Sequence, residues 1–207
     1  MPLLRKIETQ GELMGIWRMS ETLDELMAAY QLKPHEKPTF DAFRNDRRRK
    51  EWLTVRILLS ELIGDGVSID YMESGKPFLR GSKLFVSITH TIGYVGVRLG
   101  EQPVALDMEY MSNRVLRLIP RFVSEREMRY VDEDNKITTA LIIWSAKETL
   151  FKRFDISDVL FDQHLFVRSL VVNGCDGIFT GCVDKDGFYA EVELHYHLFD
   201  DLILVYC

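Results

Sequence analysis

The chain has 207 residues, of which 46% are hydrophobic and 28% are charged, so it can bury a substantial core in one large or two small domains. A net charge of -6 argues against a dedicated nucleic-acid binder, whose affinity depends on a basic surface over phosphates. The three cysteines lack the spacing of a disulfide framework or a zinc site, which predicts a reduced, intracellular protein. No apolar run approaches the roughly 20 residues of a membrane helix, and polar residues interrupt the N-terminus, so we expect a cytoplasmic protein without a secretory signal or membrane partner.

The first half of the chain predicts a strand, helices and a group of short strands. A strand is expected at about residues 13–19, and Ser20 can cap a helix that runs to about Gln31. Apolar residues then recur at helical spacing in a basic segment, and Gly64 is placed to end that helix. The apolar residues concerned are Trp52, Val55, Leu58, Leu59 and Leu62. Beyond them, glycine and proline punctuate β-prone runs as far as residue 110, which indicates a sheet.

The second half repeats this order. Residues 112–129 have helical periodicity, but Pro120 should kink or split the helix. A further helix is expected from about Lys136 to Arg153. From residue 165 onward, the segments NGCDG, DKDG and FDD are turn signals between β-prone runs and predict antiparallel hairpins.

This order predicts an α+β protein of two comparable halves, residues 1–101 and 102–207, joined at the segment GEQP. A faint internal echo favours duplication. THTIGYVGV in the first half and YHLFDDLILV in the second both place a histidine before a turn and an apolar strand.

The segment VALDMEY carries two acidic residues inside an apolar run. Residues two apart on a strand point to the same face, so Asp107 and Glu109 would converge. Adjacent carboxylates repel each other unless a cation neutralises them, and oxygen ligands without histidine or cysteine favour magnesium or calcium over zinc. Alone, the pair also fits an edge strand whose two acids face water.

The segment WSAKETLFK adds a third carboxylate and a cation. On a helix, Trp144, Glu148 and Lys152 share one face at four-residue spacing, while Lys147 lies on a neighbouring face. The same pattern fits a solvated glutamate and lysine pair, with Trp144 in the core.

Two further segments place basic groups near turns. In SGKPFL, glycine and proline restrict the backbone around Lys76, which could meet a phosphate as a point charge. VSITHT then carries His90. The alternatives are an ordinary turn lysine and a histidine bonded to backbone.

The order of these motifs, preceded by RRRKEWLTVRILL, resembles the 4'-phosphopantetheinyl transferase superfamily, in particular the surfactin-synthetase-activating type that primes nonribosomal peptide and polyketide synthetases. The likeness covers about residues 44–153. It implies a monomer of two similar halves, each a small antiparallel sheet packed with helices, related by a pseudo-twofold axis. Coenzyme A and Mg²⁺ would bind in a cleft between the halves. Such enzymes move the phosphopantetheine arm of coenzyme A to a serine of an apo carrier protein and release adenosine 3',5'-bisphosphate.

The resemblance also implies a role for each matching residue. The metal acids are Asp107, Glu109 and Glu148, and the catalytic residues are Glu148 and Lys152. The coenzyme A contacts are Lys76, Pro77, Thr89, His90 and Lys152, with Arg48 and Arg56 at the 3'-phosphate or adenine end. Glu148 or a water on the metal ion is the candidate base for the serine proton, and Lys152 would stabilise charge on the departing phosphate.

The chain departs from the family pattern in two places. Thr89 and Thr91 stand where serines are common on either side of the histidine, which keeps the hydroxyls but adds methyl groups. LDMEY replaces the commoner G-I-D-I-E run, and both acids are retained.

A basic and apolar segment follows the strand acids and could dock an acyl or peptidyl carrier protein. Arg114, Arg117 and Arg121 recur three and four residues apart, beside apolar residues that include Phe122. Carrier proteins are usually acidic, so a local basic surface would attract them despite the net negative charge of this chain. The alternative is an amphipathic core helix with a solvated arginine face.

Two other functions remain open at this point. A non-catalytic module could keep the coenzyme A site for sensing or scaffolding. A magnesium-dependent nucleotide hydrolase could use the same acids and lysines, although the chain has no P-loop.

Overall fold

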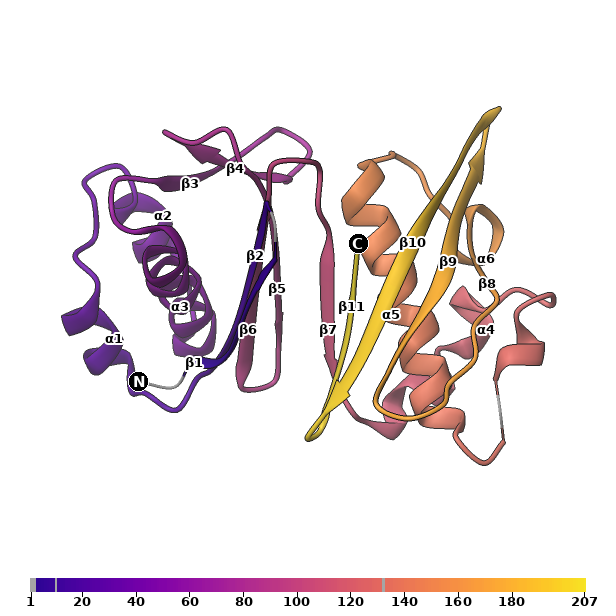
Figure 1. The fold of residues 1–207 in the computed structure, drawn as a ribbon. Coiled ribbons are helices and arrows are strands. Elements are labelled where there is room, and N and C mark those ends of the chain that lie inside the picture. Colours follow the sequence, from indigo (N-terminus) through magenta and orange to yellow (C-terminus); the bar gives the residue numbers. More distant parts are fainter. Residues whose placement is uncertain (1–2, 10, 132) are drawn as a thin grey trace. The chain divides into compact units, whose positions relative to one another are not determined.

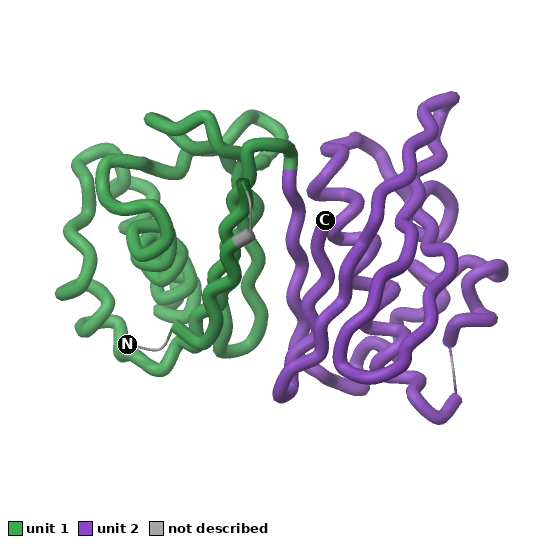
Figure 2. Tube along the Cα trace, viewed as in Figure 1, with its two compact units in different colours: residues 1–103 green, residues 104–207 purple. Residues whose placement is uncertain are grey.

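The computed structural model describes residues 3–9, 11–131 and 133–207. These residues form two compact units, residues 1–103 and 104–207 (Figure 2). The division falls after Pro103, at the end of the GEQP segment, and the boundary predicted from the sequence lies two residues earlier, after residue 101.

Unit 1 contains a four-stranded antiparallel sheet in the order β1-β2-β6-β5 (Figure 1). The strands are β1 (Leu3–Thr9), β2 (Glu12–Arg18), β5 (Phe85–Thr91) and β6 (Tyr94–Gly100). All residues of β6 are buried, because it lies inside the sheet beneath a helix. A separate two-stranded sheet joins β3 (Ser68–Tyr71) and β4 (Pro77–Arg80). The sequence did not predict β1, which adds an edge strand before the expected one.

The main helix of unit 1 is α3 (Asp46–Ile63), which packs on β2 and β6. The Asn45 side chain caps its first turn by accepting from the Arg48 N–H, and Gly64 ends it with a positive φ of 77°, as predicted. The predicted apolar residues are all buried. Helix and sheet approach closely at Gly15 of β2, where an added Cβ would lie 2.7 Å from Leu58 Cδ1.

Two shorter helices precede α3, namely α1 (Leu23–Ala29) and α2 (Lys37–Ala42). The predicted cap at Ser20 is wrong, because Thr22 caps α1. The Thr22 Oγ1 accepts from the Glu25 N–H at 3.2 Å, and the Glu25 carboxylate accepts from the Thr22 N–H at 2.7 Å. This reciprocal pair of bonds fixes the start of the helix two residues later than expected. The helix also ends earlier, since Tyr30 has an extended backbone.

Unit 2 contains a five-stranded antiparallel sheet in the order β7-β11-β10-β9-β8. The strands are β7 (Leu106–Tyr110), β8 (Leu165–Arg168), β9 (Asp176–Lys185), β10 (Phe188–Phe199) and β11 (Leu202–Tyr206). The predicted hairpins are confirmed. Asp186 and Asp200 adopt positive φ angles of 50° and 48° in the two tight turns, a conformation that aspartate tolerates better than most residues.

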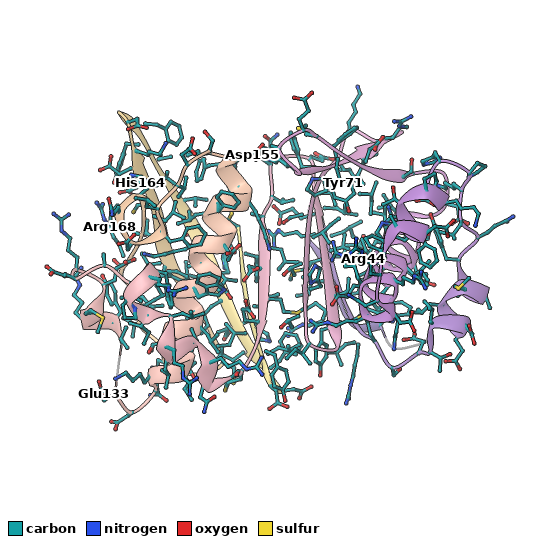
Figure 3. All side chains as sticks on the ribbon, turned by 180° about the vertical axis from the view of Figure 1, so that it is seen from behind. Arg44, Tyr71, Glu133, Asp155, His164 and Arg168 are labelled. Carbon is teal, nitrogen blue, oxygen red and sulfur yellow. The ribbon has the colours of Figure 1, made fainter. Side chains whose placement is uncertain are left out.

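The main helix of unit 2 is α5 (Lys136–Phe154), which packs on β7 and β11. It ends at Asp155, labelled in Figure 3, in a left-handed conformation. The helix predicted over residues 112–129 is split into η1 (Asn113–Arg117), α4 (Ile119–Phe122) and η2 (Met128–Tyr130). Pro120 accounts for the start of a new helix there, because proline fits the first turn and not the interior. A short helix α6 (Phe161–His164) leads into β8.

The two units have comparable connections, and the α+β class is confirmed. In each, an early strand (β2 or β7) pairs with the last strand (β6 or β11), which pairs with the strand just before it. The long helix lies between these strands in sequence. The two echoed segments form the β5–β6 and β10–β11 hairpins. Within the described residues, none of the helices combines the length and apolar character that crossing a membrane requires.

Candidate functional site

The two strand acids lie on β7, which, among the described residues, pairs with β11 at one edge of its sheet. Asp107 is buried and Glu109 is half-buried. Both bond to side chains of α5, so they share the face of the strand that the helix covers. The alternating residues Leu106 and Met108 are buried as well. The strand therefore presents two carboxylates to the helix, one buried and one half-buried.

Helix α5 supplies partners to both carboxylates. The Lys152 Nζ donates to Asp107 Oδ1 at 2.7 Å and to the backbone oxygen of Leu106 at 3.0 Å. Two turns earlier, the Trp144 Nε1 donates to Glu109 Oε1 at 2.9 Å. Helix and strand are thus joined at both acids by side chains on one helix face.

The third acid, Glu148, lies between Trp144 and Lys152 on this face and is half-buried. Burial raises its pKa to about 7, and the negative charges of Asp107 and Glu109 add to this effect, whereas Lys152 opposes it. The contacts place the same groups together, because Asp107 bonds to Lys152, Glu109 bonds to Trp144, and Glu148 lies between those two residues on one helix face. The structure therefore brings Asp107, Glu109, Glu148 and Lys152 together.

This group fits a hard divalent cation by its chemistry. All the acidic ligands are carboxylates, which suits Mg²⁺ and not zinc. Among the described residues, however, no three acidic, histidine or cysteine side chains already form a ligand cage, and the Lys152 ammonium bonds to one of the oxygens. For all three acids to hold Mg²⁺, Lys152 would have to release Asp107 and the carboxylates would have to close around the ion, with water and phosphate oxygens completing its shell.

Lys147, on the neighbouring helix face, is fully buried and belongs to the interior. Its Nζ donates to Glu127 Oε2 at 2.7 Å and to the backbone oxygens of Phe122 and Phe161. Burial lowers the pKa of Lys147, while the charge of Glu127 opposes this effect. Glu127 also accepts from the N–H of Val167 at 2.8 Å. This buried pair fixes the segments around α4, α6 and β8 to the helix.

In unit 1, the structure brings Arg48 and His90 together. The Arg48 Nη1 donates to His90 Nε2 at 2.7 Å and lies 3.3 Å from Glu51 Oε2. Arginine cannot accept a hydrogen bond, so the His90 ring nitrogen can take part in this contact only as the acceptor. Glu51 is buried and also bonds to Arg47, which makes it the anchor of an exposed basic group.

Arg56 differs from Arg48, although both lie on α3. Its guanidinium is buried, stacks on the Trp52 ring at 3.1 Å and bonds to Glu36 Oε1 at 2.7 Å. Burial lowers its pKa, and Glu36 offsets part of that effect. A phosphate contact by Arg56 would require Glu36 to release it, and this role stays a prediction.

The remaining predicted coenzyme A contacts are spread over two elements of unit 1. Lys76 lies in the turn from β3 to β4, where its backbone oxygen accepts from the Met72 N–H at 2.9 Å. Pro77 begins β4. Thr89 is buried on β5, and His90 next to it is exposed because strand residues alternate between faces.

The residues predicted to dock a carrier protein differ in their exposure to solvent. Arg114, Arg117 and Arg121 are exposed on η1 and α4. Leu118 between them is 37% exposed. Phe122, predicted with them, is fully buried against the Trp144 ring, so its ring lies in the core.

Sequence reasoning missed Glu51, Glu127 and the bond from Trp144 to Glu109. Glu51 could have been found, since it lies three and four residues after Arg48 and Arg47 on one helix face. Glu127 had no such signal, because its partner Lys147 is on another element.

Comparison with known proteins finds no family model that matches this chain, and no curated protein matches its sequence. A functional assignment therefore depends on the motifs and on the geometry of the residues.

Proposed function

We propose that this protein is a magnesium-dependent 4'-phosphopantetheinyl transferase that primes an apo acyl or peptidyl carrier protein, a holo-acyl-carrier-protein synthase activity. One observation carries the proposal. Helix α5 presents Glu148 between Trp144 and Lys152, which bond to the strand acids Glu109 and Asp107. Such a group suits the diphosphate of coenzyme A and a hard cation, because transfer at phosphorus depends mainly on positioning and charge neutralisation.

The chain's own residues would divide the chemistry among them. Asp107, Glu109 and Glu148 would hold Mg²⁺, which when bound neutralises charge on the diphosphate. Lys152 already lies 2.7 Å from Asp107 and would stabilise charge on the departing phosphate. Glu148 or a water on the metal ion is the candidate base that takes the serine proton, and a bound cation would keep Glu148 ionised for this role.

Unit 1 would bind the rest of coenzyme A. Arg48 and His90 form an exposed pair that could meet the 3'-phosphate, and Lys76 could add a point charge. By its resemblance to the transferase superfamily, the proposal includes two pseudo-twofold-related halves and coenzyme A in the cleft between them. The carrier protein would dock on the exposed Arg114, Arg117 and Arg121 of unit 2.

The test is to incubate the protein with coenzyme A, Mg²⁺ and a panel of apo carrier proteins and to measure the intact mass of each carrier. We expect one carrier to gain the mass of a phosphopantetheine arm, and chelation by EDTA to abolish the gain. Replacement of Glu148→Gln should abolish transfer. Replacement of the exposed Glu125→Gln in the same unit should not.

The principal alternative is a non-catalytic coenzyme A-binding module. It predicts binding of coenzyme A without a mass gain on any carrier. Breakdown of coenzyme A in the absence of a carrier would instead indicate a hydrolase. Each outcome differs from that of a transferase in the same assay.

A further inference from the structure

Trp144 is the point at which the interior of unit 2 meets the proposed metal site. Its ring is half-buried on α5, and its indole N–H donates to Glu109 Oε1 at 2.9 Å. Glu109 shares its strand face with Asp107, which bonds to Lys152 on the same helix. A hydrogen bond from a fixed donor opposes rotation of Glu109 away from this face.

Two aromatic rings hold the indole in place. The Phe122 ring meets it edge-on, with centroids 5.2 Å apart and planes at 72°. The Phe161 ring lies 5.6 Å from it at 35°. Phe122 is fully buried, so the indole packs against a rigid part of the core.

The two phenylalanines are themselves fixed by the residue three positions after Trp144 on the helix. The Lys147 Nζ donates to the backbone oxygen of each, and its charge is paired with Glu127 in the interior. A continuous set of contacts thus runs from the buried Lys147 through two rings to the indole and on to the Glu109 carboxylate. Every member is a described residue of unit 2.

We propose that Trp144 is a positioning residue, whose indole N–H fixes the Glu109 carboxylate for a divalent cation. This inference rests on the proposed function of the same site. Groups that hydrogen-bond to metal ligands usually change metal affinity or activity about 10- to 100-fold when they are removed, because they fix the orientation of the ligand. Trp144 fits this description and is not itself a metal ligand.

The first test replaces Trp144→Phe, which keeps an aromatic ring between Phe122 and Phe161 but removes the N–H donor. The affinity for Mn²⁺, measured without coenzyme A by electron paramagnetic resonance, should fall about 10-fold or more. A matched control is Trp52→Phe in unit 1. Trp52 is also buried, and its Nε1 has no hydrogen-bond partner among the described residues, so its loss should leave Mn²⁺ affinity unchanged.

The second test reads the hydrogen bond directly. The chain has three tryptophans, so its ¹H–¹⁵N spectrum should contain three indole signals, and the signal absent from Trp144→Phe belongs to Trp144. Glu109→Gln should shift this signal, because the acceptor loses its charge, while the Trp52 signal stays in place. A purely structural tryptophan would not respond to the charge of residue 109. This spectrum is recorded on a variant with Trp144 intact. If Trp144→Phe does not fold, the spectra of Trp17→Phe and Trp52→Phe assign the other two signals and leave the third to Trp144.

The outcomes separate the inference from the proposed function. If the wild-type protein binds no Mn²⁺, the proposed metal site fails. If the wild type binds Mn²⁺ and folded Trp144→Phe binds it equally well, only the positioning role is overturned. An indole signal that does not shift in Glu109→Gln also overturns that role.

Discussion

Replacing Glu148 by glutamine should stabilise the metal-free protein at neutral and alkaline pH. Burial and the neighbouring charges of Asp107 and Glu109 raise the pKa of Glu148 from 4.5 to about 7. At about 1.4 kcal/mol for each pH unit, the ionised form carries a penalty of about 3 kcal/mol in the folded state. Glutamine has a similar shape and no charge, so it avoids the penalty.

The dependence on pH follows from the direction of this change. Below pH 4.5 the carboxyl group is protonated in both the folded and the unfolded chain, and there is no penalty. Between pH 4.5 and about 7 the folded chain retains a proton that the unfolded chain releases, so the free energy of unfolding falls as the pH rises. Above pH 7 both states are ionised, and the full penalty is present.

Urea denaturation in EDTA at intervals from pH 4 to pH 8.5 measures this effect. The curves of wild type and Glu148→Gln should agree at pH 4 and separate to about 3 kcal/mol at pH 8, with the variant more stable. Adding Mg²⁺ at pH 8 should stabilise the wild type and have much less effect on the variant, because binding to the folded state alone raises stability. A variant no more stable than wild type at pH 8 would refute the reasoning. Glu125→Gln, at an exposed position, serves as the control.

Three further variants test other parts of the site. Lys152→Met should abolish transfer. It should nevertheless raise the affinity for Mn²⁺ severalfold, or about 1 kcal/mol, in an equilibrium titration without coenzyme A, because no ammonium then competes for Asp107. Weaker Mn²⁺ binding would contradict this expectation. Lys147→Met should lower the free energy of unfolding by about 3–5 kcal/mol in urea, because Glu127 stays buried without its cation. The double variant with Glu127→Gln should recover part of the lost stability. If Lys147→Met alone is as stable as the wild type, the ion pair of Lys147 and Glu127 does not stabilise the fold. Arg48→Ala should weaken coenzyme A binding about 10-fold in calorimetry, as expected for a lost charged hydrogen bond, and unchanged affinity would exclude Arg48 from the cofactor site.

Much of the fold could be predicted from local patterns. The apolar face of α3 and its end at Gly64 follow from residue spacing and type, and the hairpins of unit 2 follow from their turn residues. β1 was missed because Arg5, Lys6 and Glu8 interrupt its apolar residues, as is common on edge strands, so its apolar signal is weak. The start of α1 is set by the capping box of Thr22 and Glu25. This spacing is present in the sequence and could have been used to predict the start.

The proposed site was predictable to the extent that it depends on periodicity. Strand alternation placed Asp107 and Glu109 on one face of a strand, and helical spacing placed Glu148 and Lys152 on one face of a helix. Contacts between elements were not predictable, because periodicity says nothing about which side chain faces which. The bond from Trp144 to Glu109 is of this kind.

Exposure was the other property that the sequence could not supply. Arg48 and Arg56 lie on one helix and look alike in sequence, yet one is exposed and the other is buried against Glu36. Lys147 and Lys152 differ in the same way, with Lys147 in the interior and Lys152 beside the acids. Burial depends on the whole fold, so a single motif cannot assign a charged residue to a site.

The most direct measurement is anomalous diffraction from crystals grown with Mn²⁺ and coenzyme A. We expect one anomalous peak within about 2.3 Å of carboxylate oxygens of Asp107, Glu109 and Glu148, with the diphosphate of coenzyme A completing the shell. A peak elsewhere, or bound coenzyme A with no metal among these three side chains, would contradict the central claim.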